Sequence, residues 1–106
     1  MFICYKLKVL LKKNKKNYCV YMLISIYKKK LFTYVGYTNN LNYRLKLHNS
    51  GKGAKYTRGK KWKILYTEFF KNKNEAMSRE YRIKKNRKFR NMLKKEFNEN
   101  INFTSL

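Results

Sequence analysis

Hydrophobic and polar positions divide the first third of the chain into segments with strand character. Residues 18–26 ("YCVYMLISI") are almost continuously apolar and rich in β-forming residues, as expected of a central strand covered on both faces. After "YKKK" at 27–30, the run "LFTYVG" at 31–36 resumes this character. The two strands are therefore predicted to pair antiparallel around a tip at 27–30, with Tyr21 and Tyr34 facing each other.

A helical period follows the second strand. In "TNNLNYRLKLHN", Asn39 or Asn40 is expected to cap a helix whose Leu41 and Leu45, four residues apart, lie on the buried side. The loop at 50–61 ("SGKGAKYTRGKK") then holds three of the four glycines. Glycine is thus concentrated where the backbone can approach a ligand closely.

One more strand and two more helices complete the pattern. The strand is expected at 62–70 ("WKILYTEFF"), and Asn72 or Asn74 is expected to cap a helix containing "EAMSREYRIKK". In the last helix, "KFRNMLKKEFNENI", apolar residues recur every four positions. The order β-β-α-β-α-α predicts an α+β domain in which helices flank a three-stranded sheet.

The composition points to a charged partner. The 106-residue chain is long enough for one compact core and not for two. Its formal net charge of +23, with 17% aromatic residues and no proline, indicates a polyanionic partner, nucleic acid before an anionic membrane. The abundance of lysine is also the bias of an A+T-rich coding sequence, so part of the charge has a mutational explanation.

Three regions are expected along the chain: a basic N-terminal arm at 1–17, the folded domain at 18–98 and a C-terminal tail at 99–106. Lysines interrupt the apolar residues of the arm, and no window has the length of a transmembrane helix. Cys4 and Cys19 do not form a metal-binding pair, and Cys19 is expected to be buried and inert. A reduced cytoplasmic protein, associated with the nucleoid if bacterial, is the simplest interpretation.

Glu80 is the most informative of five acidic residues, all of them glutamate. Ala76, Met77 and Ile83 flank it at helical spacing, which places its carboxylate on or beside an apolar face. Such a carboxylate needs a partner, and both an ion pair with Lys84 and a metal ion satisfy the spacing. The other four are interpreted as helix-end or surface charges: Glu68, Glu75, Glu96 and Glu99.

Arg44 and His48 lie four residues apart and would project from one helix side. They suit a phosphate clamp, although such a pair is also common on plain surfaces. Tyr21 and Tyr34 are equally compatible with core packing. The absence of aspartate argues against a two-metal nuclease, and the single histidine excludes a histidine pair. Any enzymatic chemistry must therefore use tyrosine, arginine, one histidine and one glutamate.

Five segments in one order resemble a known family. "CVYMLISI", "TYVGYT", "YRLKLHNSGKGAKYTRG", "WKILYTEFF" and "EAMSREYRIKK" resemble the GIY-YIG nuclease superfamily. The likeness is greatest to small stand-alone bacterial members related to the catalytic subunit of the eukaryotic structure-specific endonuclease. It extends from about Tyr18 to about Lys95 and implies a GIY-YIG-like fold.

The resemblance assigns a role to each candidate. Tyr21 matches the tyrosine of the first motif and Tyr34 that of the second, while Arg44 and His48 match the helix arginine and the histidine one turn on. Glu80 matches the metal-binding glutamate. The family implies phosphodiester hydrolysis with one Mg²⁺ or Mn²⁺ ion, leaving a 5′ phosphate and a 3′ hydroxyl. Tyr21 is then the first choice for activating water, with Tyr34 or His48 assisting, and Arg44 holds the phosphate.

The glycine-rich loop is expected to line the path of the nucleic acid. Its contacts carry no base-reading signature, so recognition by structure or backbone is expected, of DNA with RNA also possible. A monomer without membrane contact is expected, with a protein partner as one possible source of targeting. The rival interpretations are a noncatalytic DNA- or RNA-binding module on the same fold and a cationic membrane-active protein built around the arm. The expected contact residues are Lys52, Lys55, Tyr56, Arg58, Lys60 and Lys61.

Overall fold

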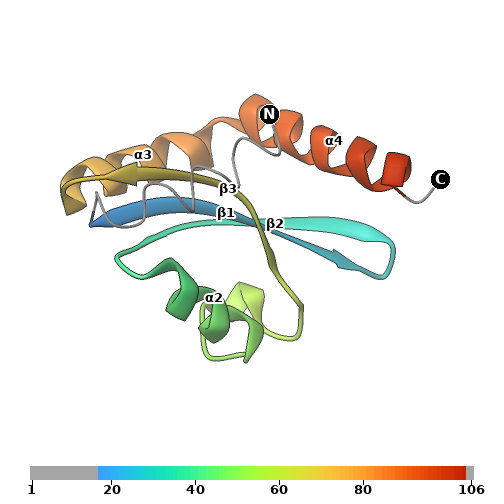
Figure 1. Cartoon of the computed structure of the whole chain (residues 1–106), viewed down its shortest axis with the longest axis horizontal. Helices are drawn as coiled ribbons and strands as arrows, with labels where there is room; N and C mark the ends of the chain where they lie inside the picture. The colour runs from blue at the N-terminus through green and yellow to red at the C-terminus, as the bar shows by residue number, and fades with distance from the viewer. Residues whose placement is uncertain (1–16, 105–106) are drawn as a thin grey trace.

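A computed structural model describes residues 17–104, so the predicted arm lies almost wholly outside the described residues, as does Cys4. Its centre is a three-stranded antiparallel sheet of β1 (Tyr18–Tyr27), β2 (Lys30–Thr38) and β3 (Lys63–Phe70), in the order β2-β1-β3 (Figure 1). The prediction that the first strand is central is confirmed.

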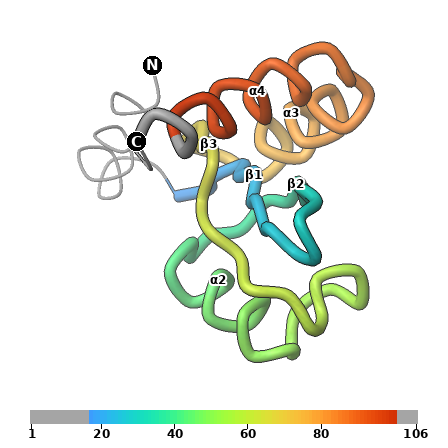
Figure 2. The backbone as a smooth tube through the Cα atoms, turned by 90° about the vertical axis from the view of Figure 1, so that its right-hand side faces the viewer, coloured from blue at the N-terminus to red at the C-terminus, as the bar shows by residue number. Residues whose placement is uncertain are grey.

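Helices cover both faces of the sheet. The α2 helix (Leu41–Asn49) lies on one face, and α3 (Lys73–Lys85) and α4 (Arg87–Thr104) lie on the other (Figure 1). Figure 2 shows the green-to-yellow segment between α2 and β3 on the same side as α2. It contains a short 3-10 helix, η1 (Lys55–Thr57), inside the predicted loop. The predicted order β-β-α-β-α-α is confirmed.

Asparagine side chains start the helices as the sequence predicts. Asn40 caps α2 and accepts a hydrogen bond from the Tyr43 amide, at 3.1 Å. Asn72 caps α3 and accepts from the Glu75 amide, at 2.9 Å. Both caps satisfy amides that the first helical turn leaves without partners. The caps therefore set the residue at which each helix begins.

The alternation of side chains along β1 divides the core into two parts. Val20, Met22 and Ile24 point toward α3 and α4 and pack with buried helix residues. Tyr21 and Leu23 point the other way and form a second cluster that includes Trp62 and packs against residues of α2. Each fully buried apolar side chain stabilises the fold by roughly 1.5–3 kcal/mol. The second cluster carries the candidate site.

The register of β1 and β2 corrects one expectation. Tyr21 is paired with Gly36, and Leu23 is paired with Tyr34. Tyr21 and Tyr34 therefore share a face as diagonal neighbours and do not stand directly opposite each other. The turn itself consists of Lys28 and Lys29, both with positive φ.

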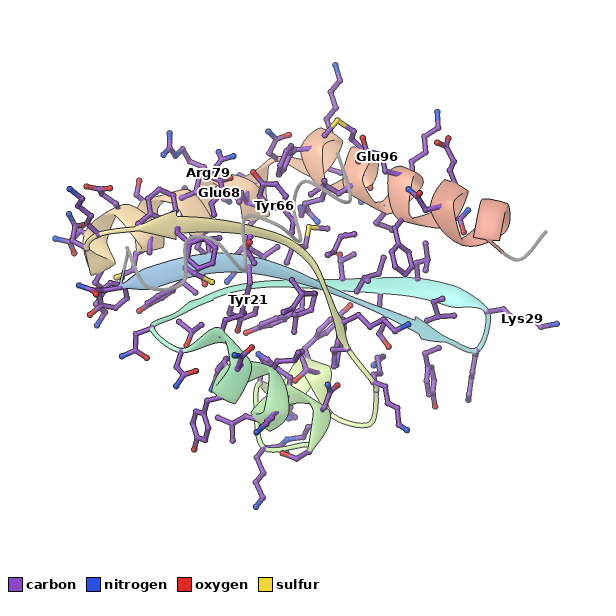
Figure 3. The ribbon with its side chains drawn as sticks, in the orientation of Figure 1. Tyr21, Lys29, Tyr66, Glu68, Arg79 and Glu96 are labelled. Atoms are coloured by element: carbon purple, nitrogen blue, oxygen red, sulfur yellow. The ribbon has the colours of Figure 1, made fainter. Side chains whose placement is uncertain are left out.

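Glu68 is not the helix-end or surface charge that the sequence suggested. Its carboxylate accepts hydrogen bonds from Arg79 Nε at 2.9 and 3.1 Å and from the Tyr66 hydroxyl at 2.7 Å. The three side chains gather between β3 and α3, on the sheet face opposite α2 (Figure 3). Burial is the main cause that raises the pKa of Tyr66 to about 12, and the hydrogen bond and charge of Glu68 act in the same direction. This partly buried network fastens α3 to the strand.

Candidate active site

The rings of three predicted site residues meet between the sheet and α2. Tyr21 projects from β1 toward α2 (Figure 3). Its ring centroid lies 5.9 Å from that of His48 on α2 and 6.4 Å from that of Tyr34 on β2. The Tyr34 and His48 centroids are 5.0 Å apart. Three different elements thus bring these rings together.

A chain of hydrogen bonds runs through the buried part of this site. The Tyr21 hydroxyl lies 2.9 Å from His48 Nε2, and His48 Nδ1 lies 2.8 Å from Thr57 Oγ1. The Thr57 hydroxyl in turn donates to the Ala54 carbonyl oxygen at 2.8 Å. Tyr21 is 2% exposed, and His48 and Thr57 are 0% exposed. The polar atoms are therefore withdrawn from solvent and matched to one another.

Two glycines make this close packing possible. A Cβ atom at Gly36 would lie 2.5 Å from the Tyr21 hydroxyl oxygen, and one at Gly53 would lie 2.5 Å from His48 Nδ1. Real Cβ atoms are not found at such distances, so any side chain at either position would displace its neighbour. The glycines of the second strand and of the loop are therefore each explained by a ring that lies against the backbone.

The site perturbs the two titratable groups that share the hydrogen bond. Burial raises the pKa of Tyr21 to about 12, while a hydrogen bond and positive charge from Arg44 act in the opposite direction. Burial, with the Arg44 charge as a second cause, lowers the pKa of His48 to about 4. At neutral pH the phenol is therefore protonated and the imidazole is neutral.

Arg44 is linked to both members of this pair. It lies on α2 one turn before His48, and it is half-buried. Its charge influences the pKa of both the Tyr21 hydroxyl and the His48 ring. The four predicted catalytic side chains are thus gathered in one place: Tyr21, Tyr34, Arg44 and His48.

Glu80 is not brought into this cluster by any interaction identified within residues 17–104. It belongs to α3, on the other face of the sheet, and its carboxylate lies 3.6 Å from Lys84 Nζ. The side chains are 20% and 50% exposed. No group of three or more histidine, cysteine or acidic side chains in the described part of the chain is arranged to hold a metal ion. The ion pair that competed with the metal interpretation is present.

The predicted nucleic-acid loop exposes most of its cationic side chains. Tyr56 is 51% exposed, and its ring stacks on that of Tyr34 at a centroid distance of 6.2 Å. Lys60 differs from its neighbours because its Nζ lies 5.0 Å from the Phe32 centroid and 5.5 Å from the Tyr27 and Tyr56 centroids. Four basic residues of the loop are exposed: Lys52, Lys55, Arg58 and Lys61.

Two polar residues to which the sequence assigned no role organise the site. Thr57 bonds His48, although only its place in the glycine-rich loop marks it in the sequence. Asn49 accepts from the Trp62 amide at 2.6 Å and donates to the Trp62 carbonyl at 3.1 Å, which joins the end of α2 to the start of β3. The indole of Trp62 also donates to the Thr57 carbonyl at 2.9 Å. The loop is therefore closed by side-chain hydrogen bonds.

Cys19, as predicted, is buried, and burial raises its pKa to about 12.

The chain is similar to known proteins over most of the residues described. A family model described as the GIY-YIG catalytic domain matches residues 17–95. A UPF0213 protein of Oceanobacillus iheyensis is 54% identical over 67 residues, which cover 62% of this chain and 78% of that protein. A UPF0213 protein of Clostridium perfringens is 64% identical over 53 residues, which cover 49% of this chain and 57% of that protein.

A third relative, the UPF0213 protein YazA of Bacillus subtilis, is 51% identical over 53 residues, or 49% of this chain and 54% of YazA. The matches therefore span little more than half of the second and third relatives. No solved structure matches the chain significantly. Within residues 17–104, none of the helices has the length and apolar character needed to cross a membrane.

Proposed function

The chain belongs to the GIY-YIG family, and from this premise we propose that it is a metal-dependent endonuclease that hydrolyses phosphodiester bonds in DNA. The observation that carries the proposal is the 2.9 Å contact between the Tyr21 hydroxyl and His48 Nε2. The charge of Arg44 lowers the pKa of both the Tyr21 hydroxyl and the His48 ring. The site therefore combines a hydroxyl, a neutral base and a fixed cation, which suits attack of water on a phosphate.

Arg44 is the proposed ligand of the scissile phosphate. Its planar guanidinium can donate two parallel hydrogen bonds to phosphate oxygens, and its charge stabilises the negative charge that develops during attack. Tyr34 is half-buried, whereas Tyr21 is almost fully buried. Tyr34 is therefore the proposed residue that orients the attacking water toward Tyr21.

The proton of the attacking water is proposed to leave through Tyr21 and His48. Free tyrosinate is scarce at neutral pH because burial raises the pKa of Tyr21 to about 12. In a concerted relay, the Tyr21 oxygen takes the water proton while its own proton passes to His48 Nε2. The water oxygen bonds to phosphorus, the bond from phosphorus to the 3′ oxygen breaks, and that oxygen takes a proton from solvent. The products are a 5′ phosphate and a 3′ hydroxyl.

Glu80 is the proposed protein ligand of one Mg²⁺ or Mn²⁺ ion. Such ions prefer oxygen ligands and often keep several waters, taking only one or two carboxylates beside the substrate phosphate. The chemistry of this donor fits, because the 3.6 Å pair with the half-exposed Lys84 leaves the carboxylate short of a tight, fully satisfied ion pair. The bound ion would offset negative charge on the leaving oxygen. This role requires the substrate to extend past the edge of the sheet, because α3 lies on the face opposite α2.

The substrate is proposed to lie along the loop after α2, where basic side chains surround the exposed Tyr56. Lysine and arginine at such a surface contact phosphates and do not distinguish bases, so we expect cleavage to follow the structure of the nucleic acid and not its sequence. A monomer acting on DNA in the cytoplasm, with RNA as a possible second substrate and a partner protein for targeting, fits this proposal.

Cleavage of labelled DNA tests the proposal. Single strand, duplex, flap and four-way junction substrates would be incubated with the protein and Mg²⁺ or Mn²⁺, and binding would be measured on the same substrates in Ca²⁺. We expect metal-dependent nicking by the unchanged protein, and loss of nicking with binding retained in Glu80→Gln. Binding without cleavage by the unchanged protein on every substrate would favour the noncatalytic module.

Lys84→Gln is the matched control for Glu80→Gln. Each substitution removes the same ion pair, so an effect that arises only from that pair should appear in both variants. A metal-binding role predicts loss of cleavage in Glu80→Gln alone, with Lys84→Gln retaining activity. Equal losses in the two variants would show that Glu80 acts through Lys84 and not through a metal ion.

A further inference from the structure

The hydroxyl of Thr57 fixes the direction of the buried hydrogen-bond chain. A threonine hydroxyl has one proton to donate, and Thr57 gives it to the Ala54 carbonyl oxygen at 2.8 Å. The contact of 2.8 Å between Thr57 Oγ1 and His48 Nδ1 then requires that Nδ1 carries the proton and donates it to the threonine oxygen. Thr57 is the acceptor in that bond.

The proton on Nδ1 also determines the role of the other ring nitrogen. A neutral imidazole with its proton on Nδ1 has a lone pair on Nε2, and that nitrogen lies 2.9 Å from the Tyr21 hydroxyl. Tyr21 must therefore donate to His48. Arg44 is consistent with this direction because a guanidinium only donates, which leaves the Tyr21 proton for the histidine.

We propose that Thr57 is a positioning residue that holds His48 in the tautomer with a free lone pair on Nε2, directed at the Tyr21 hydroxyl. Free histidine in water favours the opposite tautomer, so the bond to Thr57 selects the state that the site uses. The catalytic meaning of this tautomer rests on the proposed nuclease function. The tautomer itself does not depend on it.

The surroundings of His48 leave no competing acceptor for the Nδ1 proton among the contacts of the described residues. Gly53 packs against this side of the ring without a side chain. Within residues 17–104 the one hydrogen bond found for Nδ1 is that to Thr57, the rings of Tyr21 and Tyr34 contact the imidazole as aromatic neighbours, and Arg44 can only donate. Loss of the Thr57 oxygen would therefore leave Nδ1–H buried without a partner, which favours the other tautomer.

Nitrogen NMR of the only histidine tests the assignment directly. Protein without a histidine tag, labelled with ¹⁵N at histidine, gives signals from His48 alone. At pH 7 we expect a protonated Nδ1 and an unprotonated Nε2. The reverse pattern in the unchanged protein would overturn the proposal, whether or not any variant folds.

Variants at Thr57 then test its role. Thr57→Val keeps the shape of the side chain but removes the acceptor, and Thr57→Ser restores it. We expect the ¹⁵N shifts of the valine variant to move toward the other tautomer and those of the serine variant to match the unchanged protein. A valine variant that folds with unchanged histidine shifts would refute the positioning role.

Cleavage kinetics provide the second measurement. Thr57→Val is expected to lower kcat by roughly 10–100-fold, the usual effect of losing a residue that orients a ligating or reacting histidine, with little change in KM. Thr57→Ser should recover most of kcat. If the tautomer changes as expected while the unchanged protein cuts no substrate, the nuclease proposal fails and the positioning of His48 stands. If the tautomer changes while kcat does not, Thr57 has no part in the reaction.

Discussion

Gly36 and Tyr21 are direct partners in the β1–β2 register, and the ring of Tyr21 occupies the space where a side chain at Gly36 would lie. A Cβ at this position would be 2.5 Å from the Tyr21 hydroxyl oxygen and 3.2 Å from Cε2 of Tyr34. The absence of one methyl group therefore decides how two candidate catalytic rings are placed.

Gly36→Ala should displace the Tyr21 ring. Inserting a methyl group into a packed core generally costs about 1–3 kcal/mol of unfolding free energy, and here the displaced atom also leaves hydrogen-bond distance of His48. We expect cleavage to fall by more than the loss of folded protein explains. Urea unfolding and cleavage, measured on the same preparation, check this.

Gly51→Ala is the control for that experiment. Gly51 has φ +80, and apart from its chain neighbours no atom of the described residues lies within 4 Å of the would-be Cβ, so alanine there is strained but displaces no side chain among them. We expect a similar loss of about 1–2 kcal/mol with cleavage retained under conditions in which both variants are folded. Equal losses of cleavage in the two glycine variants would contradict a specific role for the contact between Gly36 and Tyr21.

Much of the fold could be predicted from the sequence because its signals are local. A continuous apolar run marked β1, and asparagine before the helical period marked the caps Asn40 and Asn72. The pairing register of β1 and β2 was harder to predict, because the alternation of apolar and polar residues did not distinguish Tyr34 from Gly36 as the partner of Tyr21. Such a choice depends on the turn, which here uses two lysines and no typical turn residue.

The candidate site was only partly predictable for a related reason. The resemblance pointed to Tyr21 and His48, but the bond from His48 to Thr57 depends on how the loop folds back beneath the sheet. The Glu68–Arg79 network likewise joins residues from two elements that no helical or strand spacing connects. Contacts between segments that are distant in the sequence produce no regular spacing of residues, so only the structure reveals them.

The stability of the protein should depend on pH through His48. Burial lowers its pKa from the ordinary 6.5 to about 4. Between these values the unfolded chain binds a proton that the folded chain excludes, so the free energy of unfolding falls as the pH falls from 6.5 to 4. The loss is up to roughly 3 kcal/mol, and above pH 6.5 this contribution is constant.

Urea unfolding across this pH range, on the unchanged protein and on His48→Gln, measures the effect. The five glutamates are present in both proteins, so their contribution cancels in the comparison. The variant should lose most of the slope between pH 6.5 and 5. An equal slope in both proteins would mean that His48 accepts a proton in the folded state at its ordinary pKa.

A substitution in the turn between β1 and β2 should stabilise the protein without affecting the candidate site. Lys28 and Lys29 have φ values of 50 and 66, in the left-handed region that disfavours residues with a Cβ. Figure 3 shows Lys29 at the far end of the hairpin from Tyr21. Lys29→Gly should therefore raise the unfolding free energy by about 1 kcal/mol and the Tm by about 4–8 °C, with cleavage unchanged.

Lys30→Gly is the matched control for the turn, since it removes the same charge at a strand position outside the left-handed region. It should lower the unfolding free energy by roughly 0.5–1 kcal/mol. Thermal unfolding of both variants separates the effect of backbone conformation from the effect of charge. Stabilisation by both substitutions would point to relief of charge repulsion at the tip and not to the backbone conformation.

Two adjacent lysines of the loop should behave differently on substitution. Lys60 places its ammonium near the rings of Tyr27, Phe32 and Tyr56, at 5.0–5.5 Å from their centroids, whereas Lys61 is exposed. Cation–π contacts of this kind contribute about 1 kcal/mol where they are partly desolvated. Lys60 therefore fastens the loop to the first hairpin, and Lys61 remains available to a phosphate.

Lys60→Gln should lower the unfolding free energy by about 1 kcal/mol, while Lys61→Gln should leave it within about 0.5 kcal/mol of the unchanged protein. Duplex affinity measured against salt concentration provides the complementary test. Lys61→Gln should reduce the slope of log K against log salt by about 0.9, the contribution of one lost phosphate contact, and Lys60→Gln should reduce it less. If Lys60→Gln shows the larger change in slope and no loss of stability, its ammonium leaves the rings to bind nucleic acid. The loop would then be held to the hairpin by the aromatic side chains alone.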